Sequence, residues 1–316
     1  MGIYVVTGGA GFIGSHLVDA LRADGHVVRV LDDLSTGKRE NLPEDIDLRI
    51  GDIIDTALLR RIMAGADGCF HLAAIASVAR ANEDWLGTHR TNQSGTIAVL
   101  EAARDAGHVP VVYASSAAIY GDHGPIRLHE ALVPRPMSAY GADKLGSELH
   151  ARVASIVHAT SSIGMRFFNV FGPRQDPRSP YSGVISIFAE RVLNRRTITI
   201  NGDGMQTRDF VYVGDVVAHL RAAMTRISDR AVPVAEVFNV CTGFSTSILG
   251  LAETLGEIAG WVPAVTFAPL RAGDIRASLG NPAAARAALK VSAPLPLADG
   301  LEHLLESLRV PLRMAV

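Results

Sequence analysis

Short apolar runs alternate with segments of helix length through the first half of the chain. Several runs are apolar at nearly every position, as strands buried on both faces of a sheet must be. The segments between them carry apolar residues on one face, and the first of these stops at Gly25. The alternation predicts an α/β fold with a doubly wound, Rossmann-like parallel sheet. The predicted strands are 3–7, 27–31, 47–50, 68–72, 110–114 and 163–168, and two predicted helices cover about 91–106 and 139–157.

The pattern becomes irregular after Phe171. Helices are still predicted at about 184–194, 216–225 and 248–258, with short strands between them. The apolar runs 210–213 and 237–240 have the character of strands that return to the main sheet. We therefore expect a dinucleotide-binding domain over residues 1–170, joined by about 208–242, and a smaller C-terminal α/β substrate lobe over 171–207 and 243–316.

Composition narrows the class of protein. The 316 residues are 48% hydrophobic, enough for a large core, and the net charge of -2 comes without runs of like charge. A surface for nucleic acid or anionic membrane is therefore not indicated. No apolar run reaches the ~18 residues that span a bilayer, and the two cysteines lie in apolar stretches that predict buried free thiols. We expect a cytoplasmic protein, without a metal site because no H-E-x-x-H spacing occurs.

The first predicted strand leads directly into TGGAGFIG at residues 7–14, and a helix follows. Glycines at 8, 11 and 14 allow a tight turn, close approach of the backbone to a pyrophosphate, and close packing of helix on strand. The helix N-terminus then offers unpaired N–H groups to the anion. A glycine-rich surface turn is the plainer interpretation, but the position between strand and helix favours a dinucleotide site.

Asp32 stands at the end of the second predicted strand. A carboxylate at this place can accept hydrogen bonds from the adenosine ribose hydroxyls, and its charge repels a 2′-phosphate. The sequence therefore predicts NAD rather than NADP. Lys38 and Arg39 follow within a few residues and weaken that preference.

Tyr140 and Lys144 are spaced one helical turn apart near the start of a predicted helix, so their side chains share a face. A tyrosine with a pKa of about 10 is a poor base at neutral pH. A neighbouring ammonium and a positive nicotinamide ring would favour the phenolate. Ser116 follows a predicted strand, at the sheet edge where ligands bind. A surface pair and a turn serine are the plainer interpretation, but the three together after a dinucleotide motif indicate a catalytic set.

At this point the chain resembles the extended short-chain dehydrogenase/reductase family, and within it the UDP-glucose 4-epimerase branch. The resemblance covers nearly the whole length. The segments that carry it are TGGAGFIGSH at 7–16, GDI at 51–53, HLAA at 71–74, SSAAIYGD at 115–122, YGADK at 140–144, RFFNVFGPRQ at 166–175, TRDFVYVGD at 207–215 and RAGDIRAS at 271–278.

The resemblance implies a role for each matching position. Ser116, Tyr140 and Lys144 would be catalytic. The substrate would be contacted by Ser116, Asn169, Arg208, Arg271, Asp274 and Ser278, where forked arginine donors suit a diphosphate. The cofactor NAD would be contacted by Tyr140 and Lys144 and by Gly8, Gly11, Phe12, Ile13, Gly14, Asp32, Asp33, Ser35, Thr36, Gly37, Asp52, Ile53, Leu72, Ala73, Ala74, Asn92 and Phe168.

The two positions after Ser116 bear on the reaction. The resemblance implies an acidic residue there in related dehydratases and decarboxylases, and this chain has Ala117 and Ala118. Alanine cannot transfer a proton, whereas a 4-epimerase needs no further acid. We therefore expect a UDP-hexose 4-epimerase, acting through a transient 4-keto sugar. A UDP-glucuronate 4-epimerase, a dehydratase, decarboxylase or reductase of the same fold, and a non-catalytic NAD-sensing protein remain alternatives.

The resemblance also implies a substrate range and an assembly. Its pocket-size position aligns with Ser278, where a small side chain leaves room for a 2-acetamido group. The substrates would therefore be UDP-glucose and UDP-galactose, their N-acetylated counterparts, or both. The helices at about 91–106 and 139–157 resemble those that pair in the family's dimer, so a homodimer is expected.

Overall fold

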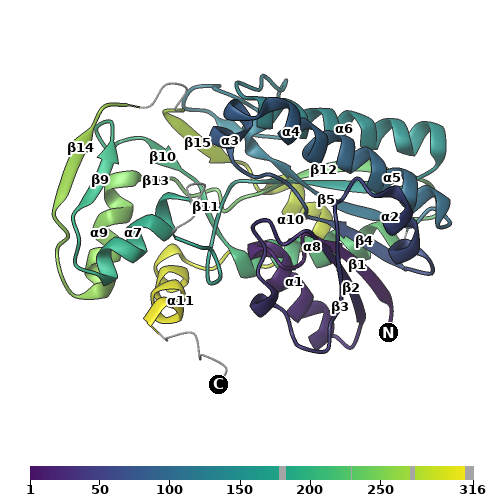
Figure 1. Ribbon diagram of the computed structural model, residues 1–316. Coiled ribbons are helices and arrows are strands. Elements are labelled where there is room, and N and C mark those ends of the chain that lie inside the picture. Colours follow the sequence, from purple (N-terminus) through teal and green to yellow (C-terminus); the bar gives the residue numbers. More distant parts are fainter. Residues whose placement is uncertain (178–182, 229, 271–274, 310–316) are drawn as a thin grey trace.

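The computed structural model describes residues 1–177, 183–228, 230–270 and 275–309 (Figure 1). Its centre is a seven-stranded sheet in which every neighbouring pair is parallel. The expected doubly wound parallel sheet is confirmed, and each of the six predicted strands is found within two residues of its predicted bounds. In spatial order the strands are β12 (Ala235–Val240), β7 (Ser162–Phe167), β5 (Val111–Ser116), β4 (Gly68–His71), β1 (Ile3–Thr7), β2 (Val27–Asp32) and β3 (Asp47–Ile50).

Helices cover both faces of this sheet (Figure 1). Consecutive residues of β1 show why the strands are apolar at every position. Val5 and Val6 are both fully buried, but they pack into different clusters on opposite faces. One face is covered by α1 (Phe12–Ala23), α8 (Val213–Ser228) and α10 (Ala283–Leu289), and the other by α2 (Thr56–Met63), α5 (Gly95–Asp105) and α6 (Ala139–His158).

The helix predicted at about 91–106 does not begin as a regular α-helix. A turn of π-helix, Arg90–Ser94, precedes α5 and continues from α3 (Val78–Glu83) and α4 (Trp85–His89). Such turns often accompany functional sites. Asn92 lies in this turn, and its side-chain amide exchanges hydrogen bonds with the backbone N–H and C=O of Ile75. The π turn therefore supports the loop that follows β4.

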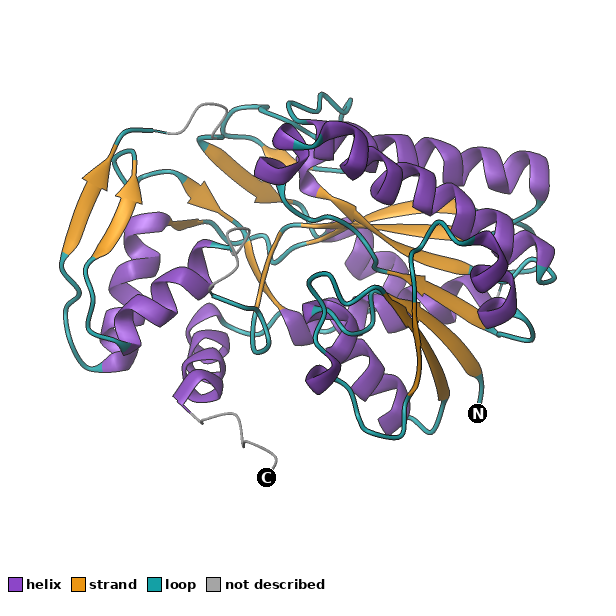
Figure 2. Cartoon of the chain, in the orientation of Figure 1, coloured by secondary structure: helices purple, strands orange, loops and turns teal. Residues whose placement is uncertain are grey.

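The smaller part of the molecule, at the left of Figures 1 and 2, packs its own core. Its helices are α7 (Val184–Leu193), α9 (Ile248–Ala259) and α11 (Leu297–Arg309). One two-stranded sheet joins β9 (Ile198–Asn201) to β14 (Val265–Ala268). A four-stranded sheet contains, in order, β13 (Thr246–Ser247), β10 (Thr207–Arg208), β15 (Ala277–Gly280) and β6 (Arg127–Leu128).

Of the two runs expected to return to the main sheet, one does so. The run 237–240 forms most of β12 beside β7, as predicted. The run 210–213 does not join the main sheet. It forms β11 (Phe210–Tyr212), which pairs with β8 (Asn169–Phe171) in a separate two-stranded sheet. The reason is that β12 already occupies the edge of β7, so β11 can pair only with the chain beyond β7. The proposed domain boundaries remain a prediction.

Both cysteines are free and buried, as expected. Within the described ranges, no helix is long and apolar enough to cross a bilayer. In the same ranges, histidine, cysteine and carboxylate side chains form no cluster that could hold a metal ion.

Candidate functional site

The glycine-rich turn after β1 leaves a helix N-terminus open. Gly8 has a positive φ of +69°, and a Cβ there would lie 2.6 Å from the backbone nitrogen of Ala73. A Cβ on Gly14 would collide with the carbonyl oxygen of Gly8, so α1 packs directly on the turn. Gly11 begins α1 in an extended conformation without a side-chain cap. The N-terminus of α1 therefore fits a pyrophosphate, with donors free to bind it.

A cleft of about 430 Å³ opens at the carboxyl ends of β1, β2, β4 and β5. This is the point between β1 and β4 where strand order reverses, the usual ligand position of such sheets. Most predicted cofactor contacts line it: Gly8, Gly11, Phe12, Ile13, Gly14, Asp32, Asp33, Ser35, Thr36, Asp52, Ile53, Leu72, Ala73, Ala74, Tyr140 and Lys144.

Three predicted cofactor residues do not line the cleft. Gly37 stands behind Asp32, where a Cβ would come 2.7 Å from the carboxylate oxygen. Asn92 supports the loop after β4. Phe168 is 6% exposed and packs against Tyr120, with ring centroids 6.5 Å apart. Residue type alone does not distinguish a residue that supports the cleft in this way from one that lines it.

Asp32 is held in place by backbone donors. Its two carboxylate oxygens accept from the N–H groups of Ala10 and Leu34, each at 2.9 Å. Burial raises the pKa of this carboxyl group, and the two hydrogen bonds work against that rise. The fixed carboxylate at the end of β2 is what ribose recognition needs, since each oxygen has a second lone pair to offer.

The predicted catalytic residues come together from two elements. The side chain of Ser138 caps α6 by accepting from the N–H of Gly141 at 3.1 Å, which places Tyr140 in the first turn. Lys144 follows on the same face, with Nζ 5.9 Å from the Tyr140 ring centroid and 2.8 Å from the carbonyl oxygen of Ala114. Ser116 ends β5 and is hydrogen-bonded to Tyr140.

The pKa of Tyr140 is raised in this structure, whereas a neighbouring ammonium by itself would lower it. Burial raises the pKa of Tyr140, and the hydrogen bond with Ser116 opposes that rise. Burial lowers the pKa of Lys144 to about 8, opposed by the charge of Asp143. Lys144 is thus mainly an ammonium at pH 7, while burial dominates at Tyr140. A lower Tyr140 pKa therefore requires further positive charge nearby, which a bound oxidised nicotinamide ring carries.

Three of the predicted substrate residues, Asn169, Arg208 and Ser278, lie in short strands outside the main sheet. Asn169 begins β8, and Arg208 of β10 is directly paired with Ser278 of β15. Arg208 also donates to the carbonyl oxygen of Ile275 at 2.8 Å. None of Asn169, Arg208 and Ser278 lines the cleft described above. Arg271 and Asp274 lie outside the described residues.

Asp209 connects these elements beneath the site. Its fully buried carboxylate accepts from the backbone N–H and the hydroxyl of Thr242 at 2.8 and 2.7 Å, and from the N–H groups of Gly243 and Gly280 at 2.9 and 3.2 Å. Burial raises the pKa of Asp209, and these donors oppose the rise. Asp209 therefore ties β15 to the loop after β12.

Sequence reasoning missed several residues that line the cleft. Ser77 and Arg80 enter it from α3, where Ser77 caps the helix. Arg174, Gln175 and Asp176 enter it from the loop after β8. The last three adjoin or lie in the segment RFFNVFGPRQ, which marked them by resemblance only, because nothing in their local pattern reveals which distant residues they meet.

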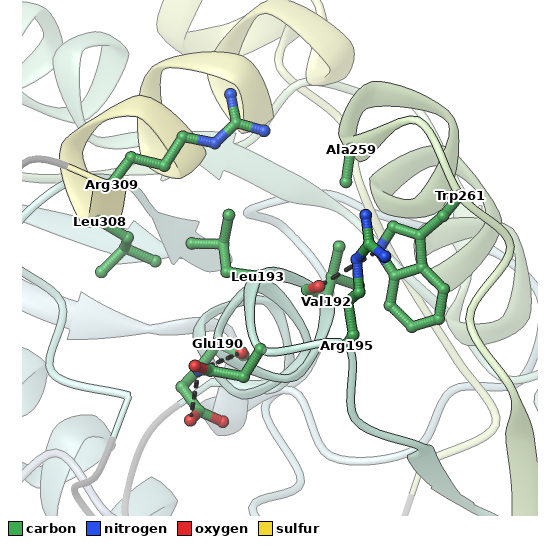
Figure 3. Close-up of a pocket in the computed structure, with 9 residues that line it drawn as sticks. Glu190, Val192, Leu193, Arg195, Ala259, Trp261, Leu308 and Arg309 are labelled. Carbon is green, nitrogen blue, oxygen red and sulfur yellow. Dashed lines mark hydrogen bonds between the residues drawn. The ribbon is translucent and has the colours of Figure 1, made fainter.

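A second hollow, of about 470 Å³, lies among the C-terminal ends of α7, α9 and α11 (Figure 3). Trp261 borders it, and its indole donates to the carbonyl oxygen of Val192 at 3.2 Å. No predicted catalytic or cofactor residue lines this hollow. The chemistry therefore belongs to the cleft at the sheet ends.

Comparison with known proteins agrees with that assignment. Residues 4–241 match the model of the NAD dependent epimerase/dehydratase family. The chain belongs to this family. The family is the one suggested by the sequence resemblance, so that expectation is confirmed, as is NAD as the cofactor.

Individual members of the NAD dependent epimerase/dehydratase family are similar over almost their whole length. A UDP-glucose 4-epimerase of Mycolicibacterium smegmatis is 38% identical over 315 residues, covering 96% of this chain and 98% of that protein. The structure of a UDP-glucose 4-epimerase with UDP-glucose from Thermotoga maritima has a TM-score of 0.92 at 36% identity, covering 97% and 98% of the two chains. A UDP-N-acetylglucosamine 4-epimerase from Methanobrevibacter ruminantium, in complex with UDP-N-acetylmuramic acid, has a TM-score of 0.89 at 33% identity, covering 97% and 98%.

Proposed function

We propose that this protein is an NAD-dependent 4-epimerase of UDP-hexoses. The observation that carries the proposal is that Tyr140 and Lys144 line the dinucleotide cleft from one face of α6, with Ser116 beside Tyr140 at the end of β5. With Tyr140 as the phenolate, which the Lys144 ammonium and a bound oxidised nicotinamide ring would favour, this set can take a proton from a sugar hydroxyl and return it. The similarity to UDP-sugar 4-epimerases across both lobes supports the substrate class.

Each of the three residues has a distinct task in this mechanism. Tyr140 accepts the proton of the sugar 4-hydroxyl, and Ser116 donates a hydrogen bond to the same oxygen as it becomes a carbonyl. Lys144 is held in place by the carbonyl oxygen of Ala114 and adds positive charge beside the phenol. NAD, held in the cleft by the turn at Gly8 and by Asp32, would supply reversible hydride transfer with C4 of the sugar. Because the proton and hydride both come back, the cofactor is unchanged after each turnover.

The residues after Ser116 support epimerisation over elimination. Ala117 and Ala118 form the turn that follows β5, where a dehydratase or decarboxylase would need an acid. A UDP-glucuronate 4-epimerase needs no such acid. It is the second candidate, because Arg80 lines the cleft and is a basic side chain that a carboxylated sugar could meet. A reductase would consume its cofactor.

The test is turnover without added cofactor. Purified protein is incubated with UDP-galactose, UDP-N-acetylgalactosamine or UDP-glucuronate, and the 4-epimers are separated by chromatography. We expect the glucose or N-acetylglucosamine epimer to form, and the nucleotide released by denaturation to be NAD with little NADP. Exclusive turnover of UDP-glucuronate would favour the second candidate. Turnover that requires added NADH would indicate a reductase.

We also propose that the protein is a cytoplasmic homodimer. The apolar stripe of α6 supports the dimer: Leu149, Val153, Ile156 and Val157 are between 49% and 72% exposed. Such a contiguous apolar face on a helix is typical of an interface. The two free cysteines support a reducing compartment.

A further inference from the structure

The chain segment 172–176, directly after β8, crosses back to the nucleotide-binding part of the molecule. The carbonyl oxygen of Pro173 lies 2.9 Å from Nε2 of His16, and because a carbonyl only accepts, the imidazole must donate. Arg174 reaches Asp19 on the same helix, α1, with Nη2 2.7 Å from Oδ2. The near end of the segment is therefore fastened to α1 by two contacts.

The far end of the segment is fastened to a different element. Asp176 accepts from Nζ of Lys38 at 2.9 Å. Lys38 belongs to the loop after β2, and its backbone N–H donates to the carbonyl oxygen of Ala10 in the glycine-rich turn at 3.0 Å. The segment is therefore tied on one side to the helix that begins the cofactor motif, and on the other to the loop that follows Asp32.

Between these ties the segment forms part of the wall of the cofactor cleft. Arg174, Gln175 and Asp176 line it together with Lys38. A dinucleotide held by the N-terminus of α1 and by the end of β2 would lie in the space these residues enclose. Arg174 has a φ of +66°, which is a left-handed conformation. This conformation is unfavourable for a residue other than glycine, and it persists because surrounding contacts offset its cost.

We propose that residues 172–176 are a strap that keeps NAD bound between turnovers, with Asp19, Lys38 and Asp176 as positioning residues that hold it closed. The inference rests on the proposed function, in which the cofactor is regenerated at each turnover and need not leave. The contacts span 138 to 157 positions of sequence, so they close the cleft across the fold instead of stabilising a local turn. Opening the strap must break all three before the nucleotide can leave.

A plainer possibility is that Lys38 contacts the cofactor directly and its pairing with Asp176 is incidental. Asp19 separates the two interpretations, because it pairs with Arg174 and does not itself line the cleft. Loss of its charge reaches the cofactor through Arg174 of the strap and does not involve Lys38. Asp45 offers a matched control: it also forms a 2.7 Å pair with an arginine of α1, Arg22, and neither residue lines the cleft.

The experiment measures the dissociation rate of NADH from the full-length protein. Wild type and the variants Asp19→Asn, Lys38→Ala, Asp176→Asn and Asp45→Asn are loaded with NADH and mixed with excess NAD. The loss of bound NADH fluorescence is then followed. A partly exposed ion pair contributes at most about fivefold, or ~1 kcal/mol. We expect Asp19→Asn, Lys38→Ala and Asp176→Asn each to speed dissociation two- to fivefold, and Asp19→Asn combined with Lys38→Ala to speed it about tenfold.

Asp45→Asn should dissociate NADH at the wild-type rate. Raised salt should speed dissociation from wild type more than from the double variant, since screening weakens only ties that are still present. An unchanged rate in Asp19→Asn and Asp176→Asn would overturn the strap, and acceleration by Lys38→Ala alone would assign Lys38 to the cofactor itself. Failure of the wild type to bind NADH or epimerise UDP-sugars would instead contradict the proposed function.

Discussion

Glu148 and Arg166 form a buried, two-pronged ion pair between α6 and β7, with Nε–Oε1 and Nη2–Oε2 distances of 2.9 and 2.7 Å. Glu148 lies one turn after Lys144 on α6 and also accepts a hydrogen bond from Ser115, the residue before Ser116. Glu148 therefore ties α6 to β7 through Arg166 and to β5 through Ser115, and α6 and β5 carry the proposed catalytic residues.

Replacing Glu148 with glutamine should cost about 3 kcal/mol of stability, because it leaves the Arg166 charge buried without its counter-charge. Glu236 is the control. It forms a similar two-pronged pair with Arg226, but both side chains are about a quarter exposed, so Glu236→Gln should cost under about 1 kcal/mol. Urea unfolding of both variants measures the difference. Equal losses of unfolding free energy in the two variants would show that burial does not make the Glu148–Arg166 pair more important for stability.

Tyr140→Phe should lower kcat at least about 100-fold while NAD remains bound, because the proposed base is removed and the ring is kept. Tyr4→Phe is the control, since Tyr4 lies in β1 outside the cleft and its loss should leave turnover near that of wild type. Steady-state kinetics and the nucleotide content of each purified variant provide the readouts. Near-normal turnover in Tyr140→Phe would show that Tyr140 is not the catalytic base.

Ser278→Tyr should reduce kcat/KM for N-acetylated UDP-sugars far more than for UDP-galactose. Ser278 is paired with Arg208 on the neighbouring strand, and an aromatic ring added there should collide with an acetamido group. Ser278→Ala keeps the small volume and should keep both activities. The measurement is kcat/KM for both substrate pairs in all three proteins. Equal losses on the two pairs would place the pocket wall elsewhere.

Stability should fall in acid because of His71. This fully buried imidazole lies between the hydroxyls of Thr7 and Thr96, at 2.8 and 3.1 Å, and burial lowers its pKa to about 3. Below the unfolded pKa of about 6.5, the unfolded chain takes up a proton that the folded chain does not. The contribution is therefore present above pH 6.5 and is lost progressively down to about pH 3, by roughly 2 kcal/mol between pH 7 and pH 5.

The variant that checks this is His71→Gln, which keeps hydrogen bonding but cannot titrate. Its free energy of unfolding should change between pH 7 and pH 5 by about 2 kcal/mol less than that of wild type. A pH dependence unchanged in His71→Gln would mean that His71 titrates alike in both states.

Charges placed on the α6 stripe should separate the proposed dimer. Leu149→Arg combined with Ile156→Arg puts two cations into the face that would be buried on pairing. Light scattering at micromolar concentration should give a dimer mass for wild type and a monomer mass for this variant. Val262→Arg, at a position 91% exposed and outside α6, should remain dimeric. A wild-type monomer would contradict the proposal.

The long helices and strands were predictable because their hydrophobic pattern extends over many residues. Mostly apolar strands of five or six residues such as β1 and β7 stand out, and so does the 20-residue α6, which begins at the predicted residue and ends one residue later than predicted. The four-stranded sheet was not predicted, because β10 and β13 have two residues each and two residues carry no period. Pairing of such strands is decided by tertiary contacts.

Some residues of the candidate site were predictable from the sequence and others were not, for the same reason. Residues that act through local geometry, such as the open turn at Gly8 and the helical spacing of Tyr140 and Lys144, leave a sequence pattern. Residues that act through distant partners do not. The pairing of Lys38 with Asp176, 138 positions apart, has no local signature, and the support that Asn92 gives to the loop at Ile75 is read in sequence only as a candidate contact.

The four hydrogen bonds of Asp209 limit how the reaction can proceed. They join β15, the strand that carries Ser278, to the loop after β12, which is the edge strand of the central sheet. If Ser278 borders the sugar pocket, a strand anchored in this way would not move with the sugar as the sugar rotates. In an epimerase the keto sugar must then expose its opposite face by rotating about its own diphosphate bonds, inside a chamber of constant shape. Inversion at C4 would then depend on rotation of the bound sugar, and the protein would contribute a rigid pocket that does not change shape during the reaction.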